Sequence, residues 1–433
     1  MNLVSRFFSR AGAAALACCA GALLLLLPMM AAQAADVRWA ASWAAAPQDY
    51  QQLPPPLRTA PPEALAASGA QTLRERLLPT LGGRRVRIRF SNVFGKVPLH
   101  IAAASVARST GGAAVSPATL RQLQFGGRTD ITLAPGAEAW SDAARLSLEP
   151  GQAAAVSFEV GAPTSFATVH HLPPDATWVL PGRAVMRTSW RDAAPSPWNH
   201  VVTGLDVASA TTPRVVVAFG DSITEGVGGR DAQGQPGSYP DQLATRLRGQ
   251  PGGRTSFAVI NAGIAGNRLL ADRIGPGGIA RFERDALGQS GVTHVLILIG
   301  INDLLFGQSP GLAEGGKPLP ETPGVEQITA GLQQLIRQAR DKGVKVLLGT
   351  LLPFKGMPEP YWSEEREARR QAVNRWIRGR QDVEAVVDFD AALRDPADPA
   401  ALNPLYDSGD HLHPSHAGYA AMAGAVDPQE LRE

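Results

Sequence analysis

The sequence predicts a chain with an all-β half followed by an α/β half that contains a mostly parallel sheet. In the first half, apolar and polar residues alternate with period two in short runs between Gly/Pro turns. From residue 214 on, apolar strand-like runs alternate with helical stretches, which indicates a sheet covered by helices on both faces. A chain of 433 residues is also long enough for two domains.

The first 34 residues read as a secretory signal peptide. Arg6 and Arg10 precede an Ala/Leu-rich stretch that ends in Ala32-Gln33-Ala34. Cleavage there would remove both cysteines, Cys18 and Cys19, and deliver the mature chain to the periplasm or the extracellular space. We therefore expect neither disulfide nor reactive thiol in the mature protein.

Residues 35–200 are expected to form a β-sandwich, with a jelly roll as one possible arrangement. Val86-Arg87-Ile88-Arg89-Phe90 would turn its apolar residues to one face and both arginines to the other, and 156–160 follow the same pattern. Further strands fit 101–106, 130–133, 144–148 and 168–170.

A polar, turn-rich linker is expected at 201–213, before the α/β half at 214–433. In this half the strands are expected at 215–219, 258–261, 295–299, 344–350 and 385–389. The helices are expected at 239–248, 279–287, 325–342, 364–378 and 415–425.

Ser222 follows the first of these strands in a Gly-Asp-Ser turn, at the end of the strand where open α/β sheets place their chemistry. A serine hydroxyl is a poor nucleophile unless a base accepts its proton and a third group orients that base. Near the C-terminus, His413 with Asp410 three residues earlier can supply both roles. The alternative is that both segments are ordinary polar turns.

Two further segments offer donors for an oxyanion, as acyl transfer requires. Asn261 to Asn267 and Gly300 to Asp303 each follow an apolar run. The N–H of Gly266, the side chain of Asn302 and the N–H of Ser222 would make a three-donor oxyanion hole.

These segments, GDSITEG, NAGIAGN, GIND and DHLHP in this order, resemble the blocks of the SGNH, or GDSL-type, hydrolase superfamily. The resemblance covers roughly residue 214 to the C-terminus and implies a three-layer, flavodoxin-like SGNH domain. The β domain in front of it looks like a branch of secreted esterases found alongside xylanases.

Other motifs are weaker. Pro310 in Gly307-Gln308-Ser309-Pro310-Gly311 lacks the N–H that a G-x-S-x-G elbow needs after its serine. Residues 275–280 loosely match a dinucleotide fingerprint but do not directly follow a strand, so a loop is expected. His411 and His416 flank the candidate base without a further cluster of ligands, so no metal or cofactor is expected.

Composition excludes further classes. The chain has 41 Lys and Arg against 39 Asp and Glu, and removal of Arg6 and Arg10 makes the mature charge neutral, without the basic footprint of a nucleic-acid-binding protein. No segment after residue 34 has the roughly 18 apolar residues of a membrane span.

Together these observations predict a secreted serine esterase that acts on a small-molecule or polysaccharide ester. A short-chain O-acyl, especially O-acetyl, carbohydrate ester is the first expectation. The alternatives are a lipolytic enzyme of the arylesterase or lysophospholipase type, a glycan O-acyltransferase, and an inactive carbohydrate-binding protein. Activity should fall at acidic pH, because His413 must be neutral to act as a base.

Overall fold

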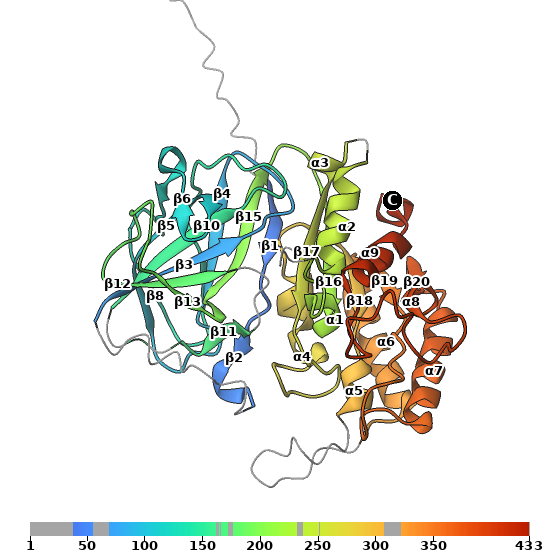
Figure 1. Ribbon diagram of the computed structural model, residues 1–433. Coiled ribbons are helices and arrows are strands. Elements are labelled where there is room, and N and C mark those ends of the chain that lie inside the picture. The colour runs from blue at the N-terminus through green and yellow to red at the C-terminus, as the bar shows by residue number, and fades with distance from the viewer. Residues whose placement is uncertain are drawn as a thin grey trace, which may run out of the picture. The chain divides into compact units, whose positions relative to one another are not determined.

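Antiparallel sheets make up the first half of the chain in the computed structural model, which describes residues 38–54, 69–161, 164, 166–171, 176–231, 237–250, 252–306 and 322–432 (Figure 1). The first sheet has the order β1 (Arg38–Ala44), β15 (Val202–Ser209), β4 (Val86–Ser91), β9 (Glu138–Trp140). The second has the order β13 (Ala194–Ser196), β12 (Thr177–Pro181), β3 (Gln71–Leu77), β10 (Ala154–Val160), β5 (Leu99–Gly111), β6 (Ala114–Val115), with β7 (Arg121–Gln122) and β8 (Ile131–Leu133) also on β5. A small third sheet has the order β14 (Trp198–His200), β11 (Thr168–His171), β2 (Gln48–Asp49).

The first two sheets meet through aromatic side chains. Phe90 of β4 and Phe158 of β10 pack edge to face, with ring centroids 5.9 Å apart. Both side chains are fully buried, as the alternation in the sequence predicts. Arg89 points the other way and is buried as well, because Trp140 and Thr203 cover that face of β4. The expected β domain is therefore present.

Two expected segments of this half differ from the sequence-based assignment. The structure places strand β15, not a linker, over Val202–Ser209, so the connection to the second half is shorter than expected. The strand expected at 144–148 makes isolated bridges instead, from Ala144 to Val86 and from Leu148 to Gly83. The segment 144–148 has one residue more than the segment 83–86 that faces it, which interrupts the ladder in the manner of a bulge.

The second half is built on a five-stranded parallel sheet with the order β17 (Phe257–Gly263), β16 (Arg214–Gly220), β18 (Val292–Leu298), β19 (Lys345–Gly349), β20 (Ala385–Val387). In sequence order this is 2-1-3-4-5, the strand order of flavodoxin-like folds. Every strand expected in this half is present, although residue 389 already belongs to a helix. The order changes direction at β16, so the ends of β16 and β18 flank the position where such sheets bind ligands.

Helices connect these strands: α1 (Ser222–Glu225), α2 (Tyr239–Arg248), α3 (Gly253–Ser256), α4 (Gly278–Phe282) continued by a π-helical turn (Glu283–Leu287), α5 (Ile301–Leu305), α6 (Val325–Asp341), α7 (Glu364–Arg378), α8 (Phe389–Leu393) and α9 (His416–Ala425). α2 and α8 both contact α9, while α6 contacts α4 and α7. These two groups of helices fit the expected covering of both sheet faces. The longest helix, α6, buries a stripe of residues at helical spacing that includes Ile328, Leu332, Leu335 and Ala339.

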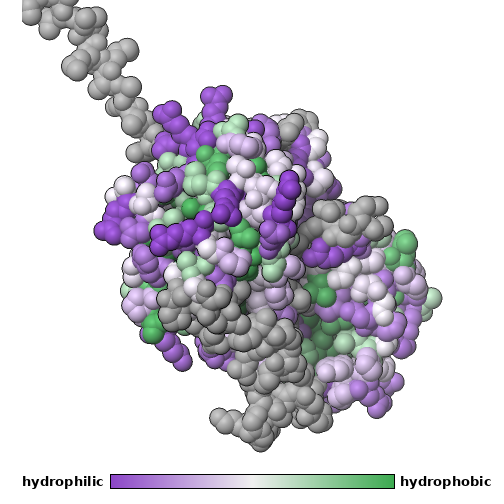
Figure 2. Space-filling model, turned by 60° about the vertical axis from the view of Figure 1, so that its left-hand side comes forward, coloured by the Kyte–Doolittle hydropathy of each residue, from purple (hydrophilic) through white to green (hydrophobic). Residues whose placement is uncertain are grey.

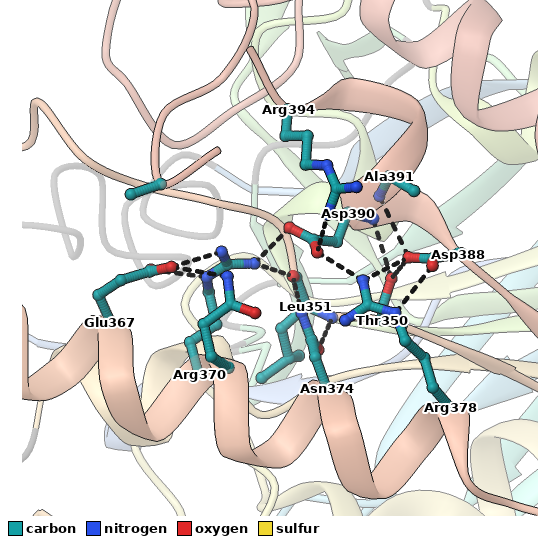
Figure 3. A network of polar contacts seen from close by, with 12 residues as sticks. Thr350, Leu351, Glu367, Arg370, Asn374, Arg378, Asp388, Asp390, Ala391 and Arg394 are labelled. Carbon is teal, nitrogen blue, oxygen red and sulfur yellow. Dashed lines mark hydrogen bonds and ion pairs between the residues drawn. The ribbon is translucent and has the colours of Figure 1, made fainter. Parts of the chain in front are cut away.

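A buried polar network fixes α7 to the end of the sheet (Figure 3). Arg370 on α7 is fully buried and donates to Asp390 at 2.6 Å, to the Leu351 carbonyl at 2.8 Å and to Glu367. Arg378 lies about two helical turns further along α7 and contacts both Asp388 and Asp390. The buried charges of this network are therefore paired, which is the condition for burying them.

The two halves share one cluster of buried hydrophobic residues. Strand β1 lies against β17, the edge strand of the parallel sheet (Figure 1). Thr80 Oγ1 lies 3.1 Å from the nitrogen and 3.0 Å from the oxygen of Val259 on β17, and Ala41 donates its N–H to the Ser290 carbonyl at 2.9 Å. The β half thus covers β17, the edge strand of the parallel sheet.

Candidate active site

Ser222 is the first residue of α1, directly after β16 and the Gly220-Asp221 turn. A Cβ at Gly220 would lie 2.1 Å from Thr224 Oγ1 and 2.3 Å from the Leu298 carbonyl oxygen, so this position accepts only glycine. Asp221 caps the helix by accepting the Ile223 N–H at 3.0 Å. The turn therefore holds Ser222 at the carboxyl end of the sheet, with its side chain nearly buried.

The structure brings His413 and Asp410 to Ser222, as the sequence predicts. His413 Nε2 lies 2.8 Å from Ser222 Oγ, and its Nδ1 lies 2.5 Å from Asp410 Oδ2. Asp410 Oδ1 also accepts the backbone N–H groups of Leu412 and His413. Partial burial works against ionisation, but the hydrogen bonds and the charge of His413 hold the pKa of Asp410 well below its usual range. An ionised Asp410 can orient His413 so that Nε2 faces the serine.

The expected oxyanion donors follow β17, β16 and β18, three adjacent strands of the parallel sheet. Gly266 lies in the turn after β17 with φ +69°, and no residue of the described chain accepts a hydrogen bond from its N–H. Asn302, on the first turn of α5, is buried and donates one amide hydrogen to the Asn267 carbonyl at 3.0 Å. An amide carries two hydrogens, so Asn302 keeps a second one for a ligand. As the first residue of α1, Ser222 has no helical acceptor for its own N–H.

Arg281 supports this arrangement, and sequence reasoning missed it. Its fully buried guanidinium donates to the Gly220 carbonyl at 2.6 Å, to the Ala262 carbonyl at 2.9 Å and to Asn267 Oδ1 at 2.8 Å. Burial lowers the pKa of Arg281 to about 10, which leaves it charged at neutral pH. The arginine therefore ties the Gly220-Asp221-Ser222 turn to the segment that carries Gly266. It lies on α4 with no motif around it to mark it.

The last residue of the GIND block also has a defined contact. Asp303 is fully buried and accepts the N–H groups of Leu269 at 2.6 Å and Leu270 at 3.1 Å. Burial raises the pKa of Asp303 despite these hydrogen bonds. The aspartate thus fixes the chain just after Asn267 relative to α5.

Asp221 directly precedes Ser222 and is fully buried. Burial raises its pKa to about 7, although the Ile223 N–H and the nearby His413 act in the opposite direction. Asp221 therefore titrates near neutral pH in the folded protein. Its contact with Ile223 is that of a turn carboxylate.

The weaker sequence motifs have structural explanations where the structure describes them. His411 pairs with Asp407, with Nδ1 2.7 Å from Oδ2, and His416 Nδ1 faces the Gly229 carbonyl at 3.1 Å. Within the described ranges, no group of three or more His, Cys, Asp or Glu could hold a metal ion. The glycine-rich stretch at 275–280 is the loop before α4 and its first residues. The segment 307–311 and the expected signal peptide at 1–34 lie outside the described residues.

Residues 218–421 match the model of the GDSL-like Lipase/Acylhydrolase family. The second half of the chain is a GDSL-like lipase/acylhydrolase domain. The matched range contains all the candidate residues, from Ser222 to His413. The expected family is thereby confirmed, and with it the class of reaction, since the GDSL-like domain makes this chain a carboxylic ester hydrolase.

Solved structures similar to the GDSL-like domain include an acetylxylan esterase from Geobacillus stearothermophilus, with 22% identity and a TM-score of 0.37 over 52% of this chain and 95% of that one. A GDSL-like lipase from Bacteroides thetaiotaomicron matches with 19% identity and a TM-score of 0.35 over 51% of this chain and 91% of that one. No curated protein sequence matches the chain.

Proposed function

We propose that the chain is a secreted serine esterase that hydrolyses short-chain O-acyl esters of carbohydrates, with O-acetyl groups as the preferred substrate. The observation that supports this most directly is the hydrogen-bonded series Asp410, His413, Ser222 at the carboxyl end of the parallel sheet. This series has the order of contacts that a serine nucleophile needs.

In the proposed first step, His413 Nε2 takes the proton of Ser222 Oγ as this oxygen attacks the ester carbonyl carbon. The carbonyl oxygen becomes an oxyanion, which accepts hydrogen bonds from the N–H groups of Ser222 and Gly266 and from the Asn302 amide. His413 then returns the proton to the leaving alcohol, and the acyl group stays on Ser222. Asp410 keeps the imidazole in the required tautomer and stabilises the imidazolium.

In the second step, water replaces the alcohol. His413 takes a proton from the water, the resulting hydroxide attacks the acyl-enzyme, and the same donors hold the second oxyanion. Return of the proton to Ser222 Oγ releases the carboxylic acid and restores the enzyme. A sugar hydroxyl in place of this water would make the reaction an acyl transfer, which is the chemistry of the alternative O-acyltransferase.

Ser222 and Asn302 are both nearly buried, with exposed fractions of 5% and 2%. On the face drawn in Figure 2, hydrophilic residues are interspersed with apolar ones over the β half. Among the described residues, no helix is long and apolar enough to cross a bilayer.

Two sequence features support the rest of the proposal. The expected signal peptide at 1–34 supports secretion, and the order of a β domain before the GDSL-like domain resembles secreted esterases found alongside xylanases. A secreted enzyme of this kind would meet plant polysaccharides outside the cell.

The test is release of acetate from acetylated xylan by the mature chain and by Ser222→Ala, alongside p-nitrophenyl esters of increasing acyl length. Acetate release that Ser222→Ala abolishes would support a carbohydrate deacetylase. Turnover of aryl or long-chain esters alone would show that the substrate is that of an arylesterase or a lipolytic enzyme. Transfer of the acyl group to an added glycan would identify an acyltransferase. Activity that persists in Ser222→Ala would refute the nucleophile.

A further inference from the structure

The turn after β17 that carries Gly266 is contacted by the β half at two places. One contact reaches it through Glu225 at the end of α1, and the other reaches Ile274 further along the same segment. Both contacts are made by buried polar side chains of the β half, His170 and Gln48. Because Gly266 offers a proposed oxyanion donor, these contacts bear on catalysis.

The first contact begins at His170 on β11. Its Nε2 lies 3.0 Å from Glu225 Oε1, in an ion-pair contact between side chains that are 6% and 5% exposed. Its Nδ1 lies 2.8 Å from the Ala46 carbonyl oxygen, which can only accept, so Nδ1 carries a hydrogen. Burial alone would lower the pKa of His170, but the Glu225 carboxylate and the Ala46 carbonyl outweigh it and raise the pKa. His170 is thus suited to be the cationic partner of Glu225.

Glu225 links His170 to the turn that carries Gly266. Its other carboxylate oxygen, Oε2, accepts the backbone N–H of Ala265, the residue just before Gly266. The peptide that joins Ala265 to Gly266 contains the Gly266 N–H, so a shift of Ala265 turns that donor. Asn261 also joins α1 to the end of β17, because its amide nitrogen donates to the Thr224 carbonyl at 2.9 Å and its Oδ1 accepts the Gly263 N–H.

The second contact begins at Gln48 on β2, which is 1% exposed. Its Nε2 donates to the Ile274 carbonyl at 2.7 Å, and its Oε1 accepts the His171 N–H at 2.7 Å. Ile274 packs directly on Gly266, since a Cβ built at Gly266 would lie 2.5 Å from Ile274 Cδ1. Gln48 therefore fixes the position of Ile274, the residue that packs on Gly266.

We propose that the β half positions the oxyanion hole, with His170 acting through Glu225 and Gln48 acting through Ile274 to fix the Gly266 N–H. This rests on the proposed esterase mechanism and adds positioning residues to it. The β half is then a working part of the active site and contributes to the rate of the chemical step.

The test is the steady-state kinetics of His170→Gln and Gln48→Met on p-nitrophenyl acetate. Gln48→Met removes both hydrogen bonds of the Gln48 side chain, and His170→Gln removes the imidazole that pairs with Glu225; each keeps a side chain of similar size. We expect kcat to fall about 10- to 100-fold with KM changed less than about twofold, because a displaced donor weakens binding of the transition state more than of the substrate. Glu225→Gln, which keeps an oxygen for the Ala265 N–H, should retain more kcat than Glu225→Ala.

Thr80→Val is the matched control, because it removes a side-chain contact to β17 at Val259 and does not alter the contacts of the turn that carries Gly266. Its kcat should stay within about twofold of the wild type at a similar loss of melting temperature. Equal kcat in His170→Gln, Gln48→Met and the wild type would overturn the positioning role. Since each variant tests its own contact, one that fails to fold leaves the other to decide. Ser222→Ala separates the two proposals: if it stays active, the esterase mechanism itself is wrong.

Discussion

Asn302 donates one amide hydrogen to the Asn267 carbonyl and keeps a second, which we assign to the proposed oxyanion hole. Asn302→Ala should therefore lower kcat by about 100- to 1,000-fold, the usual cost of one side-chain oxyanion donor. It should also lower the free energy of unfolding by about 1–3 kcal/mol, because the buried Asn267 carbonyl loses its partner. Kinetics on p-nitrophenyl acetate and urea unfolding measure the two effects. Full activity in a stable variant would remove Asn302 from the oxyanion hole.

Asp221 gives a pH dependence of stability with a defined sign. Its pKa is about 7 in the folded protein against an ordinary value of 3.8, so between these values the folded state holds a proton that the unfolded state has lost. Asp221 thus contributes stability at low pH that is lost as the pH rises through about 7, with a slope of about 1.4 kcal/mol per pH unit at most.

The measurement is urea unfolding of the wild type and Asp221→Asn from pH 4 to 8. The difference between the two isolates Asp221 from other titrating groups. Asparagine keeps an oxygen for the Ile223 N–H and cannot ionise, so the variant should gain stability relative to the wild type as the pH rises. Parallel curves would show that Asp221 does not titrate in this range.

Most of the candidate site could be located from the sequence, because three of its residues follow apolar strands and Asp410 and His413 form a recognisable block of their own. Ser222, Gly266 and Asn302 each follow a strand of the same parallel sheet, and parallel strands end at one edge. Arg281 and His170 could not be found this way. Their roles depend on contacts with carbonyl and carboxylate groups far along the chain, which no local pattern records.

At the scale of an element, α7 is held by buried charge as well as by apolar packing. Arg370→Met would leave Asp390, which is completely buried, with fewer partners, and we expect the free energy of unfolding to fall by about 3–5 kcal/mol. Arg369→Met on the same helix removes an ion pair with the exposed Glu365 and should cost less than about 1 kcal/mol. Urea unfolding compares the two variants, and equal losses would contradict a structural role for the network in Figure 3.

Elements were predictable where periodicity extends over a whole strand or helix. The residues of α2 and α7 follow from the helical pattern and from the serines that cap them, Ser238 and Ser363. Strand β15 was missed because its turn-like neighbours mask it, and its buried polar residue Asp206 is neutralised by Arg87 from β4, 119 residues earlier. Such pairing across a sheet has no signature in the local sequence.

At the scale of the whole molecule, the β half covers β17, the edge strand of the parallel sheet. A chain that begins at Arg214 would expose β17, together with the apolar surface that β1 covers. An uncovered edge strand pairs readily with other chains, so this truncated protein should self-associate and melt at a lower temperature than the full chain. Size-exclusion chromatography and circular dichroism provide the check. A monomer with the melting temperature of the full chain would show that the edge needs no cover.

The proposed nucleophile and its base are 191 residues apart in sequence, and the base lies on the last loop before the final α-helix. During synthesis, the serine turn and most of the parallel sheet leave the ribosome well before His413 does. A nascent chain of this protein therefore cannot carry out the proposed reaction until its C-terminal loop has been made and docked. The order of translation by itself therefore keeps the hydrolase inactive while the rest of the fold assembles.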